Sequence, residues 1–574
     1  MRRYLPRVQG DASARDATAD ELRARIAALE SELAAERARA AALEAERDKL
    51  RDAYRQLQLD VELLRRRIFV AKAERVDTRQ LELEFASKKK ELDALARRLG
   101  VEPPPPAAPA APAAPAAPAR RRHKPKGRRN LAISDLPVER HELLDPALEG
   151  KLERIGFEET FQIGWRKGGP VKLVIARAKY RSDAGESVVT TTMPRRTFPR
   201  SLAAPSLLAK IAVDKFADGL PLFRQEQRFE REGLSLDRGT MSRWLEDLGM
   251  TVGAVVLAMR DEAMQTAFCI STDATGVAVQ PEPSADKGRR ACRRGHFFVM
   301  LADRDHVFFE YTPRETSAVV AEMFRGFSGY VQADAKSVYD ILFTDPATRN
   351  GDDDRDRSEV GCWAHARRRF YEAAIAKDKI AREALYRIQR IFDHERSWAD
   401  APPLMRSDLR RRHIGPELDA LFDWADLHYA EVKNQRGLLR SAFGYLVRQR
   451  EALRRFLDDG RLRLDNNASE RELRQIAVGR KAWLFVGSDD HAQAAANLFS
   501  LIASCRLHGL DPEAYLRDLV RVLAQWPADR YLELAPRYWA ATRARLDPAE
   551  LERPIGELTI PAKVTPADQQ SPQG

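Results

Sequence analysis

The chain has 574 residues, of which 97 are Lys or Arg and 86 are Asp or Glu, giving a formal net charge of +11. A single core stops growing well below this length, so we expect three or four domains. Hydrophobic residues at 44% exclude a wholly disordered chain, and four scattered cysteines exclude a disulfide scaffold and fit a reducing compartment. The start carries no apolar signal segment, and the longest apolar run, 492–505, is shorter than the ~20 residues that span a bilayer. We therefore expect a cytoplasmic protein with no membrane partner.

A heptad repeat of apolar residues runs through residues 22–68, without Gly or Pro. Its seam includes Leu22, Ile26, Leu29, Leu33, Leu43, Leu50, Leu57 and Leu64. Alternating spacings of three and four residues keep one stripe facing a partner helix, so the pattern predicts a coiled coil within 15–100 that forms a homo-oligomer. A second helical stretch near 81–99 can fold back on the first. The alternative is a long helix packed on its own domain.

Residues 101–130 combine a Pro/Ala linker with a dense basic tract. Prolines at 103–118 fix the backbone, so we expect an extended, semi-rigid spacer. Seven basic residues follow within ten positions and no acid interrupts them: Arg120, Arg121, Arg122, Lys124, Lys126, Arg128 and Arg129. A tract this dense attracts phosphate without needing a fold, so we expect DNA contact; a solvated tether is the alternative.

The next two regions differ in secondary-structure pattern. Residues 131–200 alternate as short strands with turns at Gly168–Gly169 and 183–185, which predicts a small β-like module. Residues 201–262 are helical. One amphipathic helix ends near Gly233, and a second begins after Asp237, which can cap it, and runs to about Leu248. This pair suits a helix-turn-helix, in which Arg238 and Arg243 contact DNA, although any helical hairpin fits equally well.

Beyond residue 263 the pattern predicts strands over 266–343, a helical insertion over about 362–460, and further helices through Leu523. We expect the C-terminal segment, 526–574, to be disordered after Arg553.

Three carboxylates stand at positions suited to metal chemistry. Asp273 and Asp334 follow apolar strand-like runs, and Glu470 lies at a predicted helix start. Carboxylates converging from two strands and a helix can hold two divalent cations for phosphodiester displacement. Each acid also has a structural interpretation. Asp273 can cap the turn at 274–276, and Asp334 can cap the helix that begins after it. Glu470 can close a capping box with Asn467 or pair with Arg474.

Several segments resemble the TnpC transposases of the insertion sequence 66 family over about residues 200–525. They are DATGVAVQ, GYVQADAKSVYD, CWAHARRRF and LDNNASERELRQIAVGRKAWLFVGSDDHAQAAANLFSLIASC. The resemblance implies a ribonuclease H-like catalytic core at 263–525, interrupted by the helical insertion. It implies a D-D-E triad at Asp273, Asp334 and Glu470 holding two Mg²⁺ or Mn²⁺ ions. Further DNA contacts are assigned to residues of these motifs: His365, Arg367, Arg474, Arg480 and Lys481.

The chain departs from the family in two places. Family members usually carry a cysteine-based zinc segment before the catalytic region, but residues 131–200 contain no cysteine, so no zinc is predicted and the module needs its own core or is partly disordered. The first acid stands in DATG, where the family more often has an acid–Glu–Thr–Pro run. The Cys-x-x-His pairs at 362–365 and 505–508 have zinc-like spacing, but their apolar neighbours favour buried core residues.

The sequence thus predicts a multidomain α and α/β chain: a coiled coil, a β-containing module, a helical DNA-binding region and a ribonuclease H-like core. The function predicted from the resemblance is a transposase that binds terminal inverted repeats, cleaves the element ends with metal-activated water and joins them to target DNA. Accessory proteins of the same element are possible partners. The alternatives are a catalytically inactive DNA-binding or regulatory protein and a nuclease that does not recombine DNA.

Overall fold

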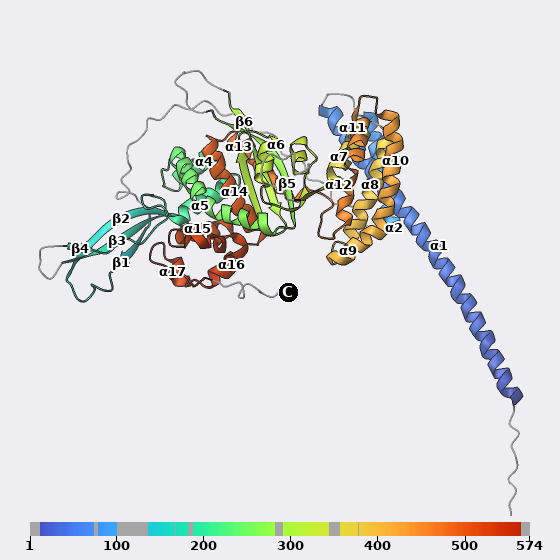
Figure 1. Ribbon diagram of the computed structural model, residues 1–574, viewed down its shortest axis with the longest axis horizontal. Helices are drawn as coiled ribbons and strands as arrows, with labels where there is room; N and C mark the ends of the chain where they lie inside the picture. The colour runs from blue at the N-terminus through green and yellow to red at the C-terminus, as the bar shows by residue number, and fades with distance from the viewer. Residues whose placement is uncertain are drawn as a thin grey trace, which may run out of the picture. The chain divides into compact units, whose positions relative to one another are not determined.

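The computed structural model describes residues 12–73, 79–99, 136–166, 168–181, 188–281, 291–343, 356–376 and 378–563 (Figure 1). The chain divides into two compact units. The smaller unit comprises residues 1–120, 367–393 and 431–442, and the larger comprises 121–366, 394–430 and 443–574. The linker and basic tract at 101–130 and the predicted turn at 183–185 lie outside the described residues. Across the described ranges, no helix is both long and apolar enough to cross a bilayer.

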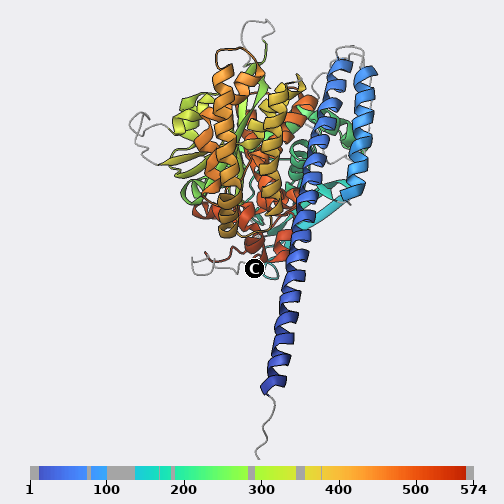
Figure 2. The same cartoon turned by 90° about the vertical axis from the view of Figure 1, so that its right-hand side faces the viewer.

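Two helices of the smaller unit form a hairpin: α1 (Ala12–Ala73) and α2 (Arg79–Leu99) (Figure 2). Lys88 Nζ lies 2.7 Å from Asp60 Oδ2, so the expected fold-back of the second helix is confirmed. The apolar stripe of α1 differs in burial along its length. Its end, at Leu63 and Leu64, is buried within the unit, whereas the seam residues Leu33 and Leu43 are exposed.

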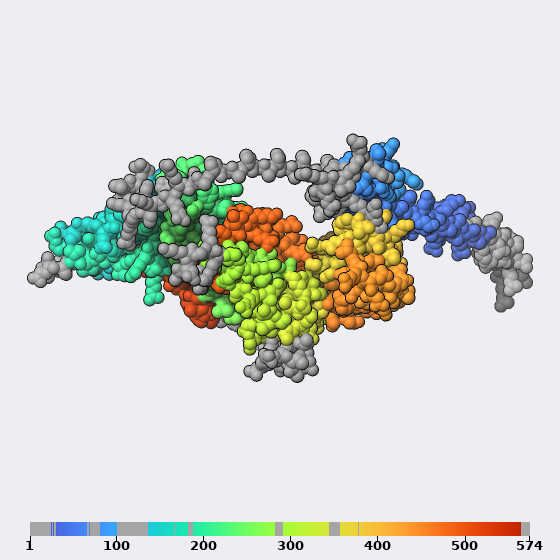
Figure 3. All heavy atoms as spheres, turned by 90° about the horizontal axis from the view of Figure 1, so that it is seen from above, coloured from blue at the N-terminus to red at the C-terminus, as the bar shows by residue number. Residues whose placement is uncertain are grey.

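The predicted β-like module is a four-stranded sheet in which β3 pairs with β1, β2 and β4. Its strands are β1 (Val138–Leu143), β2 (Arg154–Arg166), β3 (Gly169–Arg181) and β4 (Val188–Thr190). The β2–β3 turn uses Gly168 and Gly169 at φ of +106° and +132°, where side chains are disfavoured. Buried Val171, Leu173 and Tyr180 give the module a core of its own. In Figure 3 it forms a lobe of the larger unit.

A helical region joins this sheet to the centre of the larger unit. Its helices are α3 (Pro205–Phe216), α4 (Leu222–Arg231) and α5 (Arg238–Thr266). Asp237 caps α5 as predicted, accepting hydrogen bonds from the amides of Gly239 (2.8 Å) and Thr240 (3.2 Å). The predicted end of this helix at Leu248 is wrong. The buried face continues through Val252 and Met259 to pack on α14 (Asp489–Leu507), so the helix runs on to Thr266.

The predicted strands build a five-stranded mixed sheet in the order β7-β6-β5-β8-β9. The strands are β5 (Cys269–Val279), β6 (Arg293–Ala302), β7 (His306–Thr312), β8 (Gly329–Gln332) and β9 (Arg357–Val360). β5 runs antiparallel to β6 and parallel to β8. The core side chains of this sheet, such as Phe297, Phe298 and Val331, are fully buried. Short helices α6 (Ser317–Met323) and η2 (Ser337–Leu342) follow β7 and β8.

The predicted insertion is helical, and helices continue to the end of the described chain. The insertion comprises α7 (Trp363–Ile375), α8 (Lys379–Ser397), α9 (Pro403–Leu409), η4 (Arg410–Ile414), α10 (Gly415–Val432), α11 (Leu438–Arg448), α12 (Arg450–Arg454) and η5 (Arg455–Leu457). After it come α13 (Asn467–Trp483), α14, α15 (Pro512–Val522), η6 (Ala528–Leu534), α16 (Pro536–Ala544) and α17 (Pro548–Glu552).

The expectation of disorder directly after Arg553 is wrong. Ile555 and Leu558 are buried, and Arg521 donates to the Gly556 carbonyl at 2.7 Å, so the chain packs as far as the described part extends, to Lys563.

Candidate active site

The three acids singled out from the sequence come from three elements of the larger unit. Asp334 follows β8 by two residues, as predicted, and Glu470 lies in the first turn of α13. Asp273 differs from the prediction, because β5 continues to Val279 and therefore holds Asp273 in its interior instead of at its end. β5 and β8 are parallel neighbours, so the sheet places Asp273 and Asp334 close together.

A lysine and a fourth acid complete this cluster. Lys336 Nζ lies 3.4 Å from Asp334 Oδ2 and 3.8 Å from Asp273 Oδ1. It also lies 3.6 Å from Glu315 Oε1, in the loop after β7. Between Asp334 and Lys336, Ala335 has a φ of +54°, a conformation that side chains rarely adopt. Sequence reasoning missed Glu315 and Lys336; the only signal was the position of Lys336 two residues after a candidate acid.

The pKa values of Asp273 and Lys336 are both shifted in the direction expected when several carboxylates lie close together. Burial raises the pKa of Asp273 to about 6. The hydrogen bond from the Ala274 amide and the charge of Lys336 lower this pKa, whereas the charges of Asp334 and Glu470 raise it further. The side chain of Asp273 is only 16% exposed. Burial alone would lower the pKa of Lys336, but the surrounding carboxylates raise it. Ionised acids packed this closely are stabilised by a cation.

Glu470 is positioned by the residues just before it. Asn466 is fully buried and occupies the N-cap position of α13, although its side chain makes no capping hydrogen bond with a backbone amide of the helix. Its Nδ2 donates to the carbonyl of Thr272 at 2.7 Å, and its Oδ1 accepts from Ser469 Oγ at 2.8 Å. Since Thr272 immediately precedes Asp273, this side chain ties the start of α13 to the first acid. Sequence reasoning missed Asn466, whose signal was a second asparagine in the NNASE run.

Both structural interpretations of Glu470 fail. Asn467 is the first residue of the helix, so the capping box that it would open is not formed. Among the ion pairs of the described residues, Glu470 is paired with His365 and not with Arg474; its Oε1 lies 3.6 Å from His365 Nε2. The carboxylate is 43% exposed, which leaves it open to a ligand.

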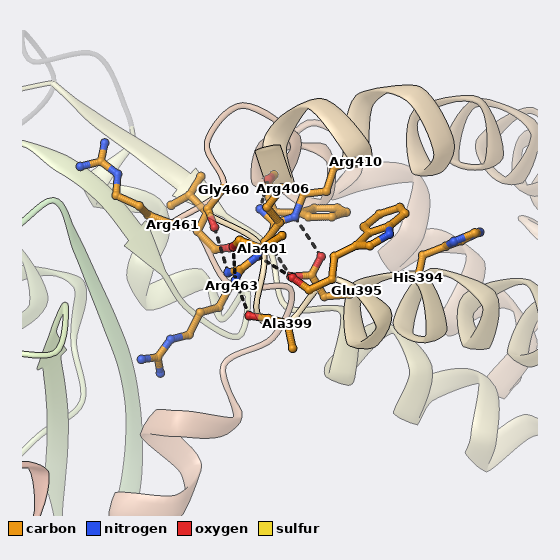
Figure 4. A network of polar contacts seen from close by, with 12 residues as sticks. His394, Glu395, Ala399, Ala401, Arg406, Arg410, Gly460, Arg461 and Arg463 are labelled. Carbon is orange, nitrogen blue, oxygen red and sulfur yellow. Dashed lines mark hydrogen bonds and ion pairs between the residues drawn. The ribbon is translucent and has the colours of Figure 1, made fainter. Parts of the chain in front are cut away.

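A buried arginine holds the segment that leads into α13 (Figure 4). Arg410 makes a two-pronged ion pair with Glu395, with Nε–Oε2 and Nη2–Oε1 distances of 2.9 and 2.5 Å. It also donates to the carbonyl oxygens of Phe456, Asp459 and Leu462 at 2.7–3.0 Å. In the figure, the side chains of Arg461 and Arg463 point away from this ion pair.

The end of β8 is bound to the same segment. Gln332 Nε2 donates to the Arg463 carbonyl at 2.8 Å, and Gln332 Oε1 accepts from Ser271 at 3.3 Å. Gln332 and Asn466 therefore fix the chain that carries Glu470 against β8 and β5, and Arg410 fixes the same segment against the helical insertion.

The donor groups suit a hard divalent cation. Asp334 Oδ1 and Glu315 Oε1 are buried and make no hydrogen bond. Carboxylate oxygens are the ligands preferred by Mg²⁺. Within the part of the chain that the structure describes, however, no three His, Cys, Asp or Glu side chains are grouped closely enough to hold a metal ion. The positive charge among these acids is that of Lys336.

The basic residues assigned to DNA lie in different settings. Arg238 and Arg243 are exposed on the first turns of α5, and Arg474 and Lys481 are exposed on α13. Arg480 instead donates to Thr275 Oγ1 at 3.1 Å and to the Gly276 carbonyl at 2.5 Å, which fastens α13 to β5.

The other two predicted contacts in CWAHARRRF are engaged within the chain. His365 faces Glu470, and Arg367 lies 3.9 Å from Glu62 in the smaller unit. The seven residues of the basic tract lie outside the described residues. The zinc-like pairs are not brought together as ligands: buried Cys362 accepts a hydrogen bond from the Asn466 amide at 3.2 Å, and Cys505 lies in the buried face of α14.

Comparison with known proteins finds three segments of the chain that match models of insertion-sequence transposases. Residues 200–494 match the model described as Transposase IS66 family, residues 500–537 match the IS66 C-terminal element, and residues 56–140 match Transposase C of IS166 homeodomain. Two relatives are from Sinorhizobium fredii (strain NBRC 101917 / NGR234). Uncharacterized protein y4qI is 29% identical over 375 residues, covering 63% of this chain and 68% of the relative. Uncharacterized protein y4hP is 29% identical over 392 residues, covering 64% and 68%.

Proposed function

The chain belongs to the IS66 family of transposases, and on that premise we propose that it is the transposase of a bacterial insertion sequence. In this proposal it binds the terminal inverted repeats of the element, cleaves the DNA at the ends and joins the freed 3′ hydroxyls to target DNA. Such an enzyme meets its substrate in the bacterial cytoplasm, where we place its activity.

One observation carries the proposal: the hydrogen bond from Asn466 to Thr272 fixes the start of α13 beside the strand that holds Asp273. The helix that carries Glu470 therefore starts beside β5, and β8, which leads to Asp334, pairs in parallel with β5. The strand order, with two antiparallel and two parallel pairings, supports a ribonuclease H-like core interrupted by the helical insertion. If these acids served only to cap helices and turns, a buried Asn466 joining α13 to β5 would not be needed.

In this mechanism Asp273, Asp334 and Glu470 would hold two Mg²⁺ or Mn²⁺ ions. When bound, such ions activate water and stabilise charge developing on phosphate oxygens. His365 orients the Glu470 carboxylate, and Asn466 keeps the first turn of α13 in place. Lys336 balances the charge of the acids and would lie beside the phosphate of a bound strand.

Other parts of the chain would bind DNA and assemble the complex. The homeodomain-named match supports DNA binding within residues 56–140, which include the basic tract. Exposed Arg238, Arg243, Arg474 and Lys481 would add contacts. The exposed seam residues of α1 support a coiled coil between copies of the chain. Proteins encoded by the same element would be accessory partners.

The test is the substitution Glu470→Gln, which keeps size and hydrogen bonding but removes the charge. Cleavage and joining of duplexes that carry the inverted repeats flanking the coding sequence should fall by about a thousandfold, because metal-bound acids supply several kcal/mol of transition-state stabilisation. Folding and end binding should remain. Glu472→Gln, two residues further on the same helix, is the matched control and should stay active.

Two results would contradict this proposal. If the folded Glu470→Gln protein joins ends at near the parental rate, the acid assignment is wrong. If the parental protein binds the ends but never cleaves them with Mg²⁺ or Mn²⁺, the chain is the catalytically inactive DNA-binding alternative.

A further inference from the structure

A strained turn follows α13, at the far end of the helix from Glu470. Leu484 has φ +65° and ψ −47°, and the Phe485 amide donates to the Trp483 carbonyl at 2.8 Å. A hydrogen bond across one residue with this sign of φ defines the rare, strained form of the γ-turn. The conformation is costly for leucine, and such strain is characteristic of sites with a function.

The turn presents apolar side chains to solvent. The side chain of Leu484 is 68% exposed, and that of the following Phe485 is 45% exposed. This pair, which we name the apolar tip, is held in place by the next residue. The amide of Val486 donates to the Ala278 carbonyl at 2.9 Å, and the Val486 carbonyl accepts from Gln280 at 2.8 Å. The tip is therefore anchored to β5, the strand that carries Asp273.

Two exposed cations, Lys481 on α13 and Arg294 on β6, lie near the apolar tip. Lys481 is exposed one turn earlier on α13, and Arg474 is exposed on the same helix. On the sheet, exposed Arg294 lies opposite Ala278, the residue to which the tip is bound. The nearest acid along the chain, Asp489, is already paired with Arg293. An apolar tip with exposed cations beside it matches a polyanion that has an apolar interior.

Duplex DNA has this chemistry, with charged phosphates outside and stacked bases within. A second copy of the chain fits less well, because it too carries a net charge of +11. With α13 laid along the axis of a duplex, its length gives a spacing along the DNA. The 13 residues from Glu470 to Trp483 rise ~20 Å, which corresponds to about six base steps of duplex.

We propose that Leu484 and Phe485 form a wedge that opens a base step of the bound DNA, about six base steps from the cleaved phosphate. The inference rests on the proposed function, since it places the cleaved phosphate at Glu470. It adds a contact with the bases to the phosphate contacts that the proposed function assigns to exposed basic residues.

The experiment uses the full chain and duplexes carrying the flanking inverted repeat, with the fluorescent base 2-aminopurine placed at successive steps from the cleavage position. EDTA prevents cleavage. The parental protein should raise the fluorescence severalfold at about six steps from that position, because an unstacked base is no longer quenched. The double variant Leu484→Ala/Phe485→Ala should lose the rise while its end affinity falls only about tenfold, because the phosphate contacts remain.

Leu257→Ala is the matched control, because Leu257 is 57% exposed on a different helix, α5. It should keep the full fluorescence rise. The wedge is refuted if the double variant keeps the rise, or if the parental protein binds the ends and no step becomes fluorescent. A double variant that changes the sedimentation of the free protein and not the fluorescence would assign the tip to contacts between protein copies. Failure of the parental protein to bind the ends at all would instead overturn the proposed function.

Discussion

Replacing Asp273 by Asn should make the metal-free protein more stable and, if the proposed function holds, should abolish DNA cleavage. Burial raises the pKa of Asp273 to about 6 from an ordinary value of 3.8. A difference of about two pH units corresponds to ~3 kcal/mol, since each unit is worth about 1.4 kcal/mol. The attraction of Lys336 is already contained in this balance. Asparagine carries no charge and can still accept the hydrogen bond that the Ala274 amide now donates to Asp273 Oδ1 at 2.7 Å.

The sign of the pH dependence follows from the raised pKa. The folded chain binds the Asp273 proton more tightly than the unfolded chain does. The stability that this proton contributes is therefore complete below pH ~4 and is lost as the pH rises through about 6. The advantage of Asp273→Asn should be absent near pH 4 and should reach up to ~3 kcal/mol at pH 7.5.

Urea unfolding of both proteins in EDTA, at several pH values from 4.5 to 7.5, measures this difference. Adding Mg²⁺ should then stabilise the parental protein and not the variant, because a ligand stabilises only the form that binds it. Asp247→Asn, at an exposed position of α5, is the control and should change stability by less than ~0.5 kcal/mol. Equal stability of the parental protein and Asp273→Asn at pH 7.5 would refute the argument that this acid is held in an unfavourable, charged state awaiting a cation.

Two further predictions concern assembly and the position of Glu470. The double change Leu33→Glu/Leu43→Glu should leave the helical content unchanged and abolish self-association in analytical ultracentrifugation, because both side chains lie on the exposed seam. If the oligomer persists, the interface between copies lies elsewhere. Asn466→Ala should cost ~2 kcal/mol of stability, because two buried hydrogen bonds are lost, and should lower Mg²⁺-dependent cleavage more than end binding. Cleavage that falls only in proportion to the folded fraction would reduce Asn466 to a structural role.

Local signals in the sequence were sufficient for the elements that carry the site. The cap at Asp237, the glycine turn at Gly168–Gly169 and the strand-like run before Asp334 each depend on a few neighbouring residues, and the structure has all three. The ends of elements were harder to predict. We expected the strand-like run to end just before Asp273, yet pairing with β6 carries β5 on to Val279.

Contacts between distant segments could not be predicted from one sequence. Glu315 and Lys336 meet only because β7 and β8 run in the same direction, so that the loops after them lie at the same edge of the folded sheet. The heptad stripe of α1 likewise does not specify its partner. Its end packs within the smaller unit, where Arg55 lies 2.8 Å from Asp393 of α8, while Leu33 and Leu43 stay exposed. An apolar stripe fits a helix of the same chain as well as one of a second copy.

The helical insertion explains how an acid far along the chain can still be placed accurately. The insertion leaves the sheet and returns to it at one place: the Gly361 amide donates to the Ala452 carbonyl at 2.8 Å, and the Trp363 amide to the Leu464 carbonyl at 3.1 Å. The Trp363 ring adds a bond to the Leu453 carbonyl at 2.9 Å. Because both ends are pinned together, a change of length between them costs only loop-closure entropy, which grows slowly with length. The helices between Trp363 and Ala452 can therefore change in length without moving Glu470, as long as His365, Glu395 and Arg410 keep the contacts that hold Glu470 and the segment before it.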